Sequence, residues 1–299
     1  MCYNESMNLP KEIERAFPAR PTEAHKYSVG VVTVVGGSAR YNHAPVIAGV
    51  GARVAGAGLV QLVVPDASRL AAGSLLPEAT FTKQTPVCVP PPADVTAVGM
   101  GMGTSANAEM LLSRLLSGSA GRFVLDADAL TVLAKWYADK TDVLPRTDGQ
   151  TLVLTPHVGE AARLLACSPE EVRRDRLAAV RTLVARYHAV VVLKGAHTLV
   201  AAPDRETVYT CEAGNPFMAL GGMGDLLTGI LAARWAYLAA REPSGVSVAQ
   251  AFTAACAAVW LHATASDRIV QADPPGDPSL MNTAAVVSSL RVTLERNGL

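Results

Sequence analysis

The residues with the clearest potential for chemistry lie in segment 214–233, where a glycine-rich loop leads into an apolar helical pattern. Glycines just before a helix let backbone N–H groups converge on one point, and the helix N-terminus adds partial positive charge, so such a loop can bind phosphate. Asp225 follows directly, although a carboxylate repels a bound phosphate. We interpret Asp225 as a base that takes a proton from a substrate hydroxyl. The structural alternative is close packing at the glycines and a helix cap at Asp225.

Charged residues also follow short apolar runs elsewhere in the chain. Asp126 and Asp128 come after the run at 123–125, and they could hold a hydrated Mg²⁺ through water or cap the following helix. Lys194 follows the run at 190–193, and a lysine that leaves a buried strand is well placed to meet phosphate. A plain turn is the structural alternative for this lysine.

The histidines give weaker indications. His157 and Glu160 are three residues apart, but no second histidine and no cysteine pair lies nearby, so ligand contact or a local hydrogen bond is favoured over a metal site. His43, His188 and His262 fall in helical patterns and are interpreted as structural.

Alternating strand and helix patterns must position these residues. Strands are predicted at 29–35, 59–64, 95–98, 123–125, 151–154 and 190–193, with an edge hairpin at 198–202 and 207–209. Helices are predicted at 43–57, 107–116, 168–187, 225–240, 247–265 and 283–296, and segment 65–94 is less regular. The helix at 168–187 opens with a capping-box pattern. The alternation predicts an α/β fold with a parallel sheet, in which ligands bind at the carboxyl ends of the strands.

The composition favours a small-molecule enzyme. Half of the 299 residues are hydrophobic and only 5% are aromatic, as expected for short buried strands under close-packed helices. Lys plus Arg equals Asp plus Glu, at 26 each, and no basic run stands out, so a nucleic-acid partner is not expected.

Cysteine usage and hydropathy predict a cytoplasmic protein. The five cysteines are scattered singly, which fits a reduced compartment. The stretch nearest to a membrane span, 46–65, contains four glycines and Arg53 and is interpreted as a helix followed by a strand, so no membrane association is expected. Residues 1–28 are expected to form a polar arm over the domain surface, and residues 29–299 are expected to form one domain.

Six motifs in order resemble those of the ADP-dependent NAD(P)H-hydrate dehydratases, a family of the ribokinase-like superfamily. They are the Gly36-Gly37-Ser38 turn with Tyr41 and Ala44, and the segments 99–103, 125–130, 155–160, 193–198 and 214–225. The resemblance covers nearly the whole chain after the arm. It implies a three-layer α/β/α sandwich with a mostly parallel sheet. The epimerase domain that many relatives carry in front is not found, so the resemblance implies a stand-alone dehydratase.

The resemblance also implies a reaction. The family dehydrates the S epimer of hydrated NADH or NADPH with ADP, or ATP in eukaryotic relatives, and releases AMP and phosphate. Mg²⁺ is expected with the nucleotide phosphates, with no direct protein ligand. Relatives assemble as tetramers, so a homo-oligomer is expected.

By position, the resemblance implies roles for individual residues. Asp225 would deprotonate the ring hydroxyl, and the loop of Gly222, Met223 and Gly224 would stabilise the transferring phosphoryl group. The nucleotide would contact Lys194, Gly195, Ala196, His197, Thr198 and Gly224. The hydrated dinucleotide would contact Ala44, Gly101, His157 and Asp225, and further contributions are expected from Asn215, Asp126 and Glu160.

The chain departs from the family pattern at three places, all near the expected dinucleotide pocket. Met100 and Val158 stand where proline is usual or frequent, and Asn42-His43 replace small residues before Ala44. None removes a catalytic group. Two other functions remain open at this point: a ribokinase-like kinase of a small alcohol such as a hydroxyethylthiazole or a sugar, and a nucleotide-binding module without catalysis.

Overall fold

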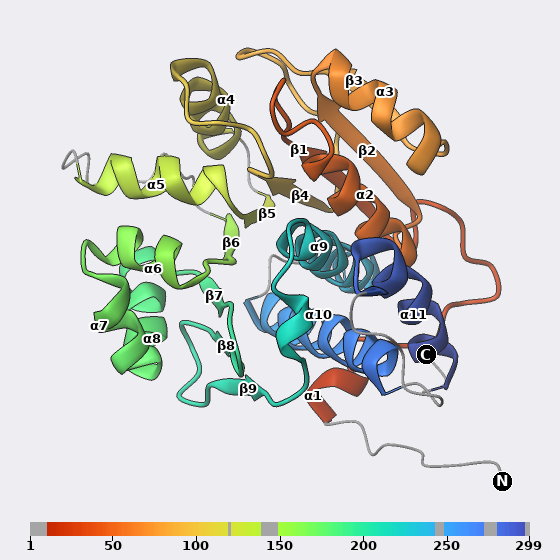
Figure 1. Cartoon of the computed structure of the whole chain (residues 1–299). Helices are drawn as coiled ribbons and strands as arrows, with labels where there is room; N and C mark the ends of the chain where they lie inside the picture. Colours follow the sequence, from red (N-terminus) through yellow and green to blue (C-terminus); the bar gives the residue numbers. More distant parts are fainter. Residues whose placement is uncertain (1–10, 119–120, 139–148, 243–247, 272–279, 297–299) are drawn as a thin grey trace, which may run out of the picture.

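The apolar runs form one nine-stranded sheet in the computed structural model, which describes residues 11–118, 121–138, 149–242, 248–271 and 280–296 (Figure 1). The strands are β1 (Val31–Val35), β2 (Leu59–Val64), β3 (Thr80–Lys83), β4 (Val95–Val98), β5 (Arg122–Leu125), β6 (Thr151–Leu154), β7 (Val190–Leu193), β8 (Thr198–Ala201) and β9 (Tyr209–Cys211). Their order across the sheet is β3-β2-β1-β4-β5-β6-β7-β8-β9. Every neighbouring pair from β3 to β7 is parallel, and β8 and β9 add an antiparallel edge.

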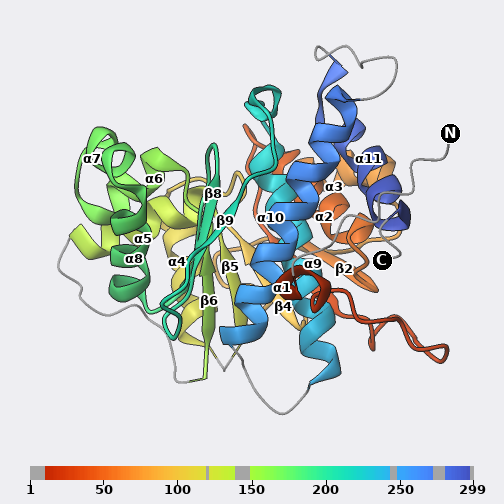
Figure 2. The ribbon, with the colours of Figure 1, turned by 90° about the horizontal axis from the view of Figure 1, so that it is seen from below.

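Helices cover both faces of the sheet, so the predicted three-layer α/β/α sandwich is confirmed (Figures 1 and 2). One layer contains α4 (Ala106–Ser117), α5 (Asp128–Ala138), α6 (Val158–Leu165), α7 (Pro169–Arg174) and α8 (Arg176–Tyr187). The other contains α1 (Lys11–Glu14), α2 (Ala44–Val54), α3 (Asp66–Leu75), α9 (Met223–Arg241), α10 (Val248–Val270) and α11 (Thr283–Arg296). Strands β1, β6 and β7 are buried along their whole length, which explains why they appear in the sequence as continuous apolar runs.

Close packing of α2 against α9 fixes the helix that carries Asp225. A side chain at Gly229 would meet the carbonyl oxygen of Ala48 at 1.9 Å, and one at Gly51 would meet the carbonyl oxygen of Leu226 at 2.5 Å. Only glycine allows the two helix backbones to approach this closely. The first turns of α9 are therefore held firmly over the sheet.

One helix among the described residues, α10, is long and apolar enough to cross a membrane by length and composition. Its most apolar window is 78% buried inside the domain, as is typical of the core helix of a soluble protein. The stretch 46–65 forms most of α2 and then β2, as predicted.

The described part of the amino-terminal segment packs into the same layer. Ile13 and Ala16 are fully buried in the core formed with α9 and α10. Arg234 of α9 donates hydrogen bonds to the carbonyl oxygens of Ala16 and Ala55, and Tyr237 donates to that of Pro18 at 2.9 Å. This segment is tied to the carboxyl half of α9.

Three details of the predicted secondary structure differ. The helix predicted at 168–187 is broken at Asp175, whose non-helical backbone ends α7 and whose carboxylate caps α8 by accepting from the N–H of Ala178. The segment 65–94 contains α3 and β3. The second hairpin strand is β9 at Tyr209–Cys211 rather than 207–209, because the connection after β8 is longer than predicted.

Candidate active site

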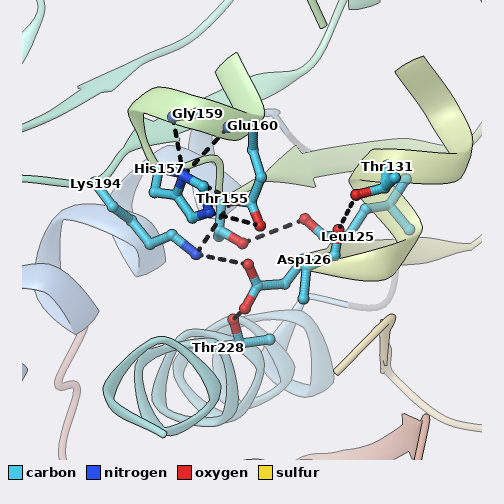
Figure 3. Close-up of polar contacts among 10 residues, drawn as sticks. Leu125, Asp126, Thr131, Thr155, His157, Gly159, Glu160, Lys194 and Thr228 are labelled. Carbon is cyan, nitrogen blue, oxygen red and sulfur yellow. Dashed lines mark hydrogen bonds and ion pairs between the residues drawn. The ribbon is translucent and has the colours of Figure 1, made fainter. Parts of the chain in front are cut away.

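The carboxyl ends of β5 and β7 and the amino half of α9 bring three side chains into one chain of hydrogen bonds (Figure 3). The Lys194 ammonium donates to Oδ1 of Asp126 at 2.7 Å, and the Thr228 hydroxyl donates to Oδ2 of the same carboxylate at 2.7 Å. Asp126 and Thr228 are buried. The Asp126 carboxylate therefore binds Lys194 and the Thr228 side chain of α9, and it does not cap α5.

His157 and Glu160 join this chain from the start of α6. Nδ1 of His157 accepts from the N–H groups of Gly159 and Glu160, and the Glu160 carboxylate accepts from the N–H of His157 at 2.8 Å. This is a capping box with histidine at the N-cap, so the predicted local hydrogen bond is confirmed. Glu160 also lies 3.8 Å from the Lys194 ammonium.

The glycine loop runs directly past this ion pair. A Cβ atom added at Gly224 would lie 3.4 Å from Nζ of Lys194 and 3.9 Å from Oδ2 of Asp126. Gly222 has a left-handed backbone with φ of 90°, and its position faces side chains of Ile47 and Thr283. The loop thus lies between the Lys194–Asp126 pair and the helices α2 and α11.

Asp225 is partly buried in the first turn of α9, and no hydrogen bond to its carboxylate is found within the described residues. Burial raises its pKa to about 7, the negative charges of Asp126, Asp128 and Glu160 add to the rise, and Lys194 opposes it. A carboxylate with such a pKa can accept a proton near neutral pH, which is what a general base requires.

The neighbouring groups show the same balance of burial and charge. Burial by itself would lower the pKa of Lys194, but the carboxylates of Asp126 and Glu160 outweigh it, so the pKa is raised and the ammonium stays charged. Burial raises the pKa of Glu160, and Lys194 offsets part of that rise. Burial, with Lys194 as a second cause, lowers the pKa of His157, which favours a neutral ring.

The other side of the site is built from small residues. Gly101 has φ of 65°, and a side chain there would meet Tyr41 at 2.6 Å and Cβ of Ala44 at 3.2 Å. Gly99 has φ of 123° and lies against the carbonyl oxygen of Asp126. The structure thus brings Gly101, in the loop after β4, next to Ala44 at the start of α2, and neither residue carries a side chain larger than a methyl group.

The loop after β7 carries the residues expected to contact a nucleotide. Arg176 of α8 donates to the carbonyl oxygens of Leu193 and Ala196, and its guanidinium lies beside Gly195. Thr198 donates to the carbonyl oxygen of Gly195 at 2.9 Å, whereas the exposed His197 pairs with Glu212.

Arg176 and Thr228 were missed by sequence reasoning. A continuous helix at 168–187 gave no indication that Arg176 reaches the loop after β7. The break at Asp175 makes Arg176 the first residue of α8 and directs its side chain to that loop. Thr228 lies three residues after Asp225, a spacing that places both on one face of a helix and could have indicated it.

The remaining candidates have structural roles in the chain as described. Asn215 binds Asp267 of α10 at 2.9 Å and accepts from the N–H of Phe217, so it anchors the loop that precedes α9. His43 is the residue before α2, His188 ends α8 with a left-handed backbone, and His262 is buried in α10. Within the described ranges no group of three His, Cys, Asp or Glu residues is arranged to hold a metal ion.

The mostly parallel sheet between two helix layers, with a glycine loop at the carboxyl ends of its strands, is an α/β fold of the ribokinase-like type. Residues 32–284 match the family model described as NAD(P)H-hydrate dehydratase, and the chain belongs to this family. It is 39% identical over 258 residues to the ADP-dependent (S)-NAD(P)H-hydrate dehydratase of Neisseria meningitidis, with 85% of this chain and 81% of that protein covered. The resemblance noted in the sequence is thereby confirmed.

Further comparisons agree with this assignment. A bifunctional NAD(P)H-hydrate repair enzyme of Gloeobacter violaceus is 37% identical over 268 residues, with 87% of this chain covered, and the chain spans 49% of that relative's length. The fold is similar to the crystal structure of the ADP/ATP-dependent NAD(P)H-hydrate dehydratase of Bacillus subtilis, with a TM-score of 0.81, 23% identity, and coverage of 97% of this chain and 99% of that one.

Proposed function

We propose that this protein repairs the S epimer of hydrated NADH or NADPH with ADP as phosphoryl donor, releasing AMP and phosphate. Family membership makes the chain an NAD(P)H-hydrate dehydratase. The observation that carries the assignment to this site is Asp225, a partly buried carboxylate with a pKa of about 7 at the start of the glycine loop's helix. It lies in the field of Lys194, which holds a permanent positive charge beside Gly224.

In the proposed mechanism Asp225 takes the proton from the ring hydroxyl of the hydrate. The hydroxyl oxygen then attacks the terminal phosphorus of ADP, and the bond between that phosphorus and the bridging oxygen breaks to release AMP. Phosphate leaves with the electrons of the carbon–oxygen bond, and a proton lost from the neighbouring ring carbon restores the double bond. The raised pKa of Asp225 makes it a stronger base than an ordinary aspartate.

The loop and the lysine stabilise the transferring phosphoryl group. Backbone N–H groups of Gly222, Met223 and Gly224 lie at the start of α9, where the helix dipole also favours negative charge. Lys194 supplies a positive charge on the far side of Gly224. The absence of side chains at both glycines leaves room for a phosphoryl group to approach the backbone.

Ligand contacts follow the two sides of the site. The nucleotide contacts the loop from Lys194 to Thr198, including Gly195, Ala196 and His197. Arg176 supports this loop by donating to the carbonyl oxygens of Leu193 and Ala196. The hydrated ring lies at Asp225, and the rest of the dinucleotide contacts Ala44, Gly101 and His157. Asp126 and Glu160 support Lys194, and Asn215 supports the glycine loop.

Mg²⁺ would accompany the nucleotide. Asp126 has both carboxylate oxygens committed to Lys194 and Thr228, and Asp128 accepts from the N–H of Gly103 at 2.8 Å. These residues fit a cation held mainly by phosphate oxygens and water, in a site whose several carboxylates favour a divalent ion. Bound in this way, Mg²⁺ would neutralise part of the phosphate charge.

We further propose a cytoplasmic homotetramer. Cys88, Cys167, Cys211 and Cys256 are free thiols in the structure, which fits a reducing compartment. Leu280 and Val292, at the start and in the body of the carboxyl-terminal helical region, are exposed apolar residues that an interface would cover. Light scattering of the purified protein in solution measures the assembly directly, and a monomer would contradict the tetramer.

The proposed reaction is tested by incubating the protein with purified S-hydrated NADH, Mg²⁺ and either ADP or ATP. We expect the dihydronicotinamide absorbance to return with one of the nucleotides, and Asp225→Asn to lower the rate by at least about 1,000-fold, because the base is lost while the shape is kept. An Asp225→Asn variant as active as the parent would contradict the mechanism. Accumulation of a stable phosphate ester from a small alcohol would instead support the kinase.

A further inference from the structure

Among the described residues, Thr228 is the only residue of α9 that donates a hydrogen bond to the Asp126 carboxylate. The bond from its hydroxyl to Oδ2 is 2.7 Å long, and Thr228 is fully buried. A buried hydroxyl that donates to a buried carboxylate forms a strong hydrogen bond, because the acceptor is charged and water is excluded. The contact joins residues 102 positions apart in the sequence.

The hydrogen bond from Thr228 to Asp126 connects α9 to the lysine at the glycine loop. Asp126 has its other oxygen bound to the Lys194 ammonium, so the two bonds together fix the plane of the carboxylate and the position of the lysine (Figure 3). Lys194 lies next to Gly224, and Thr228 is three residues after Asp225 on the same helix. The base and the lysine are therefore linked through one short, rigid path.

We infer that Thr228 is a positioning residue for phosphoryl transfer: its hydroxyl orients Asp126, which in turn holds the Lys194 ammonium beside the glycine loop and in register with Asp225. This inference rests on the proposed function for the use of the lysine, since it assumes that Lys194 meets the nucleotide's phosphates. Thr228 itself touches no reacting atom.

Loss of the hydroxyl has a physical consequence that loss of the methyl group does not share. Without the donor, Oδ2 of Asp126 is buried and unsatisfied, so the carboxylate can turn and draw Lys194 away from the loop. Serine keeps the donor and loses one methyl group, whereas valine keeps the shape and loses the donor. Thr264 of α10 is also buried but lies outside the hydrogen bonds of the site, which makes Thr264→Val a matched control.

The test compares Thr228→Val, Thr228→Ser and Thr264→Val with the unmodified enzyme. Calorimetric titration with Mg²⁺ and ADP, without the hydrate, measures nucleotide affinity. We expect Thr228→Val to raise the dissociation constant roughly three- to tenfold, and to lower kcat for the hydrate by about ten- to a hundredfold, because misplaced charge costs most in the transition state. Thr228→Ser is expected to stay within about threefold of the parent in both measurements, and Thr264→Val within about twofold. Thermal unfolding checks that each variant is folded.

Two outcomes would overturn the inference. Unchanged ADP affinity and kcat in a folded Thr228→Val variant would show that the hydroxyl positions nothing of importance. A Thr228→Ser variant as impaired as Thr228→Val would assign the effect to packing of the methyl group. If the unmodified enzyme fails to convert the hydrate to NADH, the proposed function fails. Weaker ADP binding in Thr228→Val but not in Thr228→Ser would still support the positioning role.

Discussion

The two ends of helix α9 use charge in opposite ways. At the amino end, Asp225 lies partly buried beside three other carboxylates with no hydrogen bond to its side chain among the described residues. At the carboxyl end, the buried Arg234 guanidinium donates to two carbonyl oxygens and lies over the rings of Phe17 and Tyr237 at 4.3 and 4.9 Å. The carboxylate at the amino end lacks a hydrogen-bond donor among the described residues, whereas the guanidinium at the carboxyl end has two carbonyl acceptors and two aromatic rings beside it.

The difference shows how one helix can serve chemistry and stability together. A base must keep its lone pairs free for a proton, so the amino end cannot neutralise Asp225 with a permanent partner. Burial of the Asp225 carboxylate, together with repulsion from the neighbouring carboxylates, destabilises the fold. The carboxyl end offsets this cost by binding the amino-terminal segment: Arg234 binds Ala16 and Tyr237 binds Pro18, about 14 and about 18 Å along the helix from the base. Variants at either end can therefore separate activity from stability.

Arg234→Met should have the largest effect on stability. The change leaves the carbonyl oxygens of Ala16 and Ala55 buried without their donor, so we expect a loss of about 3 kcal/mol, or roughly 150-fold in the folding equilibrium. Urea unfolding measures it. Activity of the folded enzyme should stay within about twofold, because Arg234 lies several turns from Asp225. A large loss of kcat with normal stability would contradict the separation of the two ends.

The pH dependence of the rate tests the amino end. Asp225 acts when deprotonated, and burial with neighbouring carboxylates raises its pKa to about 7. We therefore expect kcat/KM for the hydrate to fall about tenfold for each pH unit below that value, or roughly a hundredfold over two units, and to level off above it. Asp128→Asn should move this limb to lower pH, because the Asp128 charge contributes to the raised pKa. A flat profile through this range would rule out Asp225 as the base.

The two ends of α9 also differ in how much of their structure can be predicted from the sequence. The glycine spacing before Asp225 predicted a loop of unusual backbone conformation leading into a helix, because positive φ at Gly222 and room beside Gly224 are properties of glycine itself. That this loop binds phosphate stays a prediction. Alternating patterns likewise predicted the parallel sheet. Nothing local indicated that Arg234 would bind Ala16, since that contact joins residues 218 positions apart and depends on the assembled layers.

The network around Lys194 lies between these cases. The sequence placed Asp126, Glu160 and Lys194 at strand ends, and the shared carboxyl edge of a parallel sheet made their proximity expected. Their partners were not predictable in the same way, because Thr228 and Arg176 reach the site from helices whose rotation and breaks are set by packing. Asp175 shows this directly, since its non-helical backbone divides a segment that the sequence pattern predicts as one helix.

Asp225→Asn should make the folded protein more stable while it removes the activity. The folded-state pKa of Asp225 is raised, so its ionisation destabilises the folded protein as pH rises from about 4 to about 7. Asparagine carries no such charge. At about pH 8 we expect the unfolding free energy of the variant to exceed that of the parent by on the order of 2 kcal/mol. This is less than the full pKa shift would give, because the side chain is partly exposed. Near pH 4 the two proteins should be equally stable. Urea titrations at both pH values measure this, and a variant less stable than the parent at high pH would contradict it.

Tyr237→Phe should have the smallest effect and act at the carboxyl end alone. The Tyr237 hydroxyl donates to the carbonyl oxygen of Pro18 at 2.9 Å and accepts from Arg241, so its removal should cost about 1 kcal/mol and loosen the segment at 16–20. Limited proteolysis reports cleavage in this segment, and urea unfolding reports the global loss. Tyr187→Phe is the matched control, because that buried tyrosine donates to the carbonyl oxygen of Leu164, in the opposite helix layer. Faster cleavage in both variants would show that proteolysis follows global stability, whereas faster cleavage in Tyr237→Phe alone places the amino-terminal segment under the control of the carboxyl end of α9.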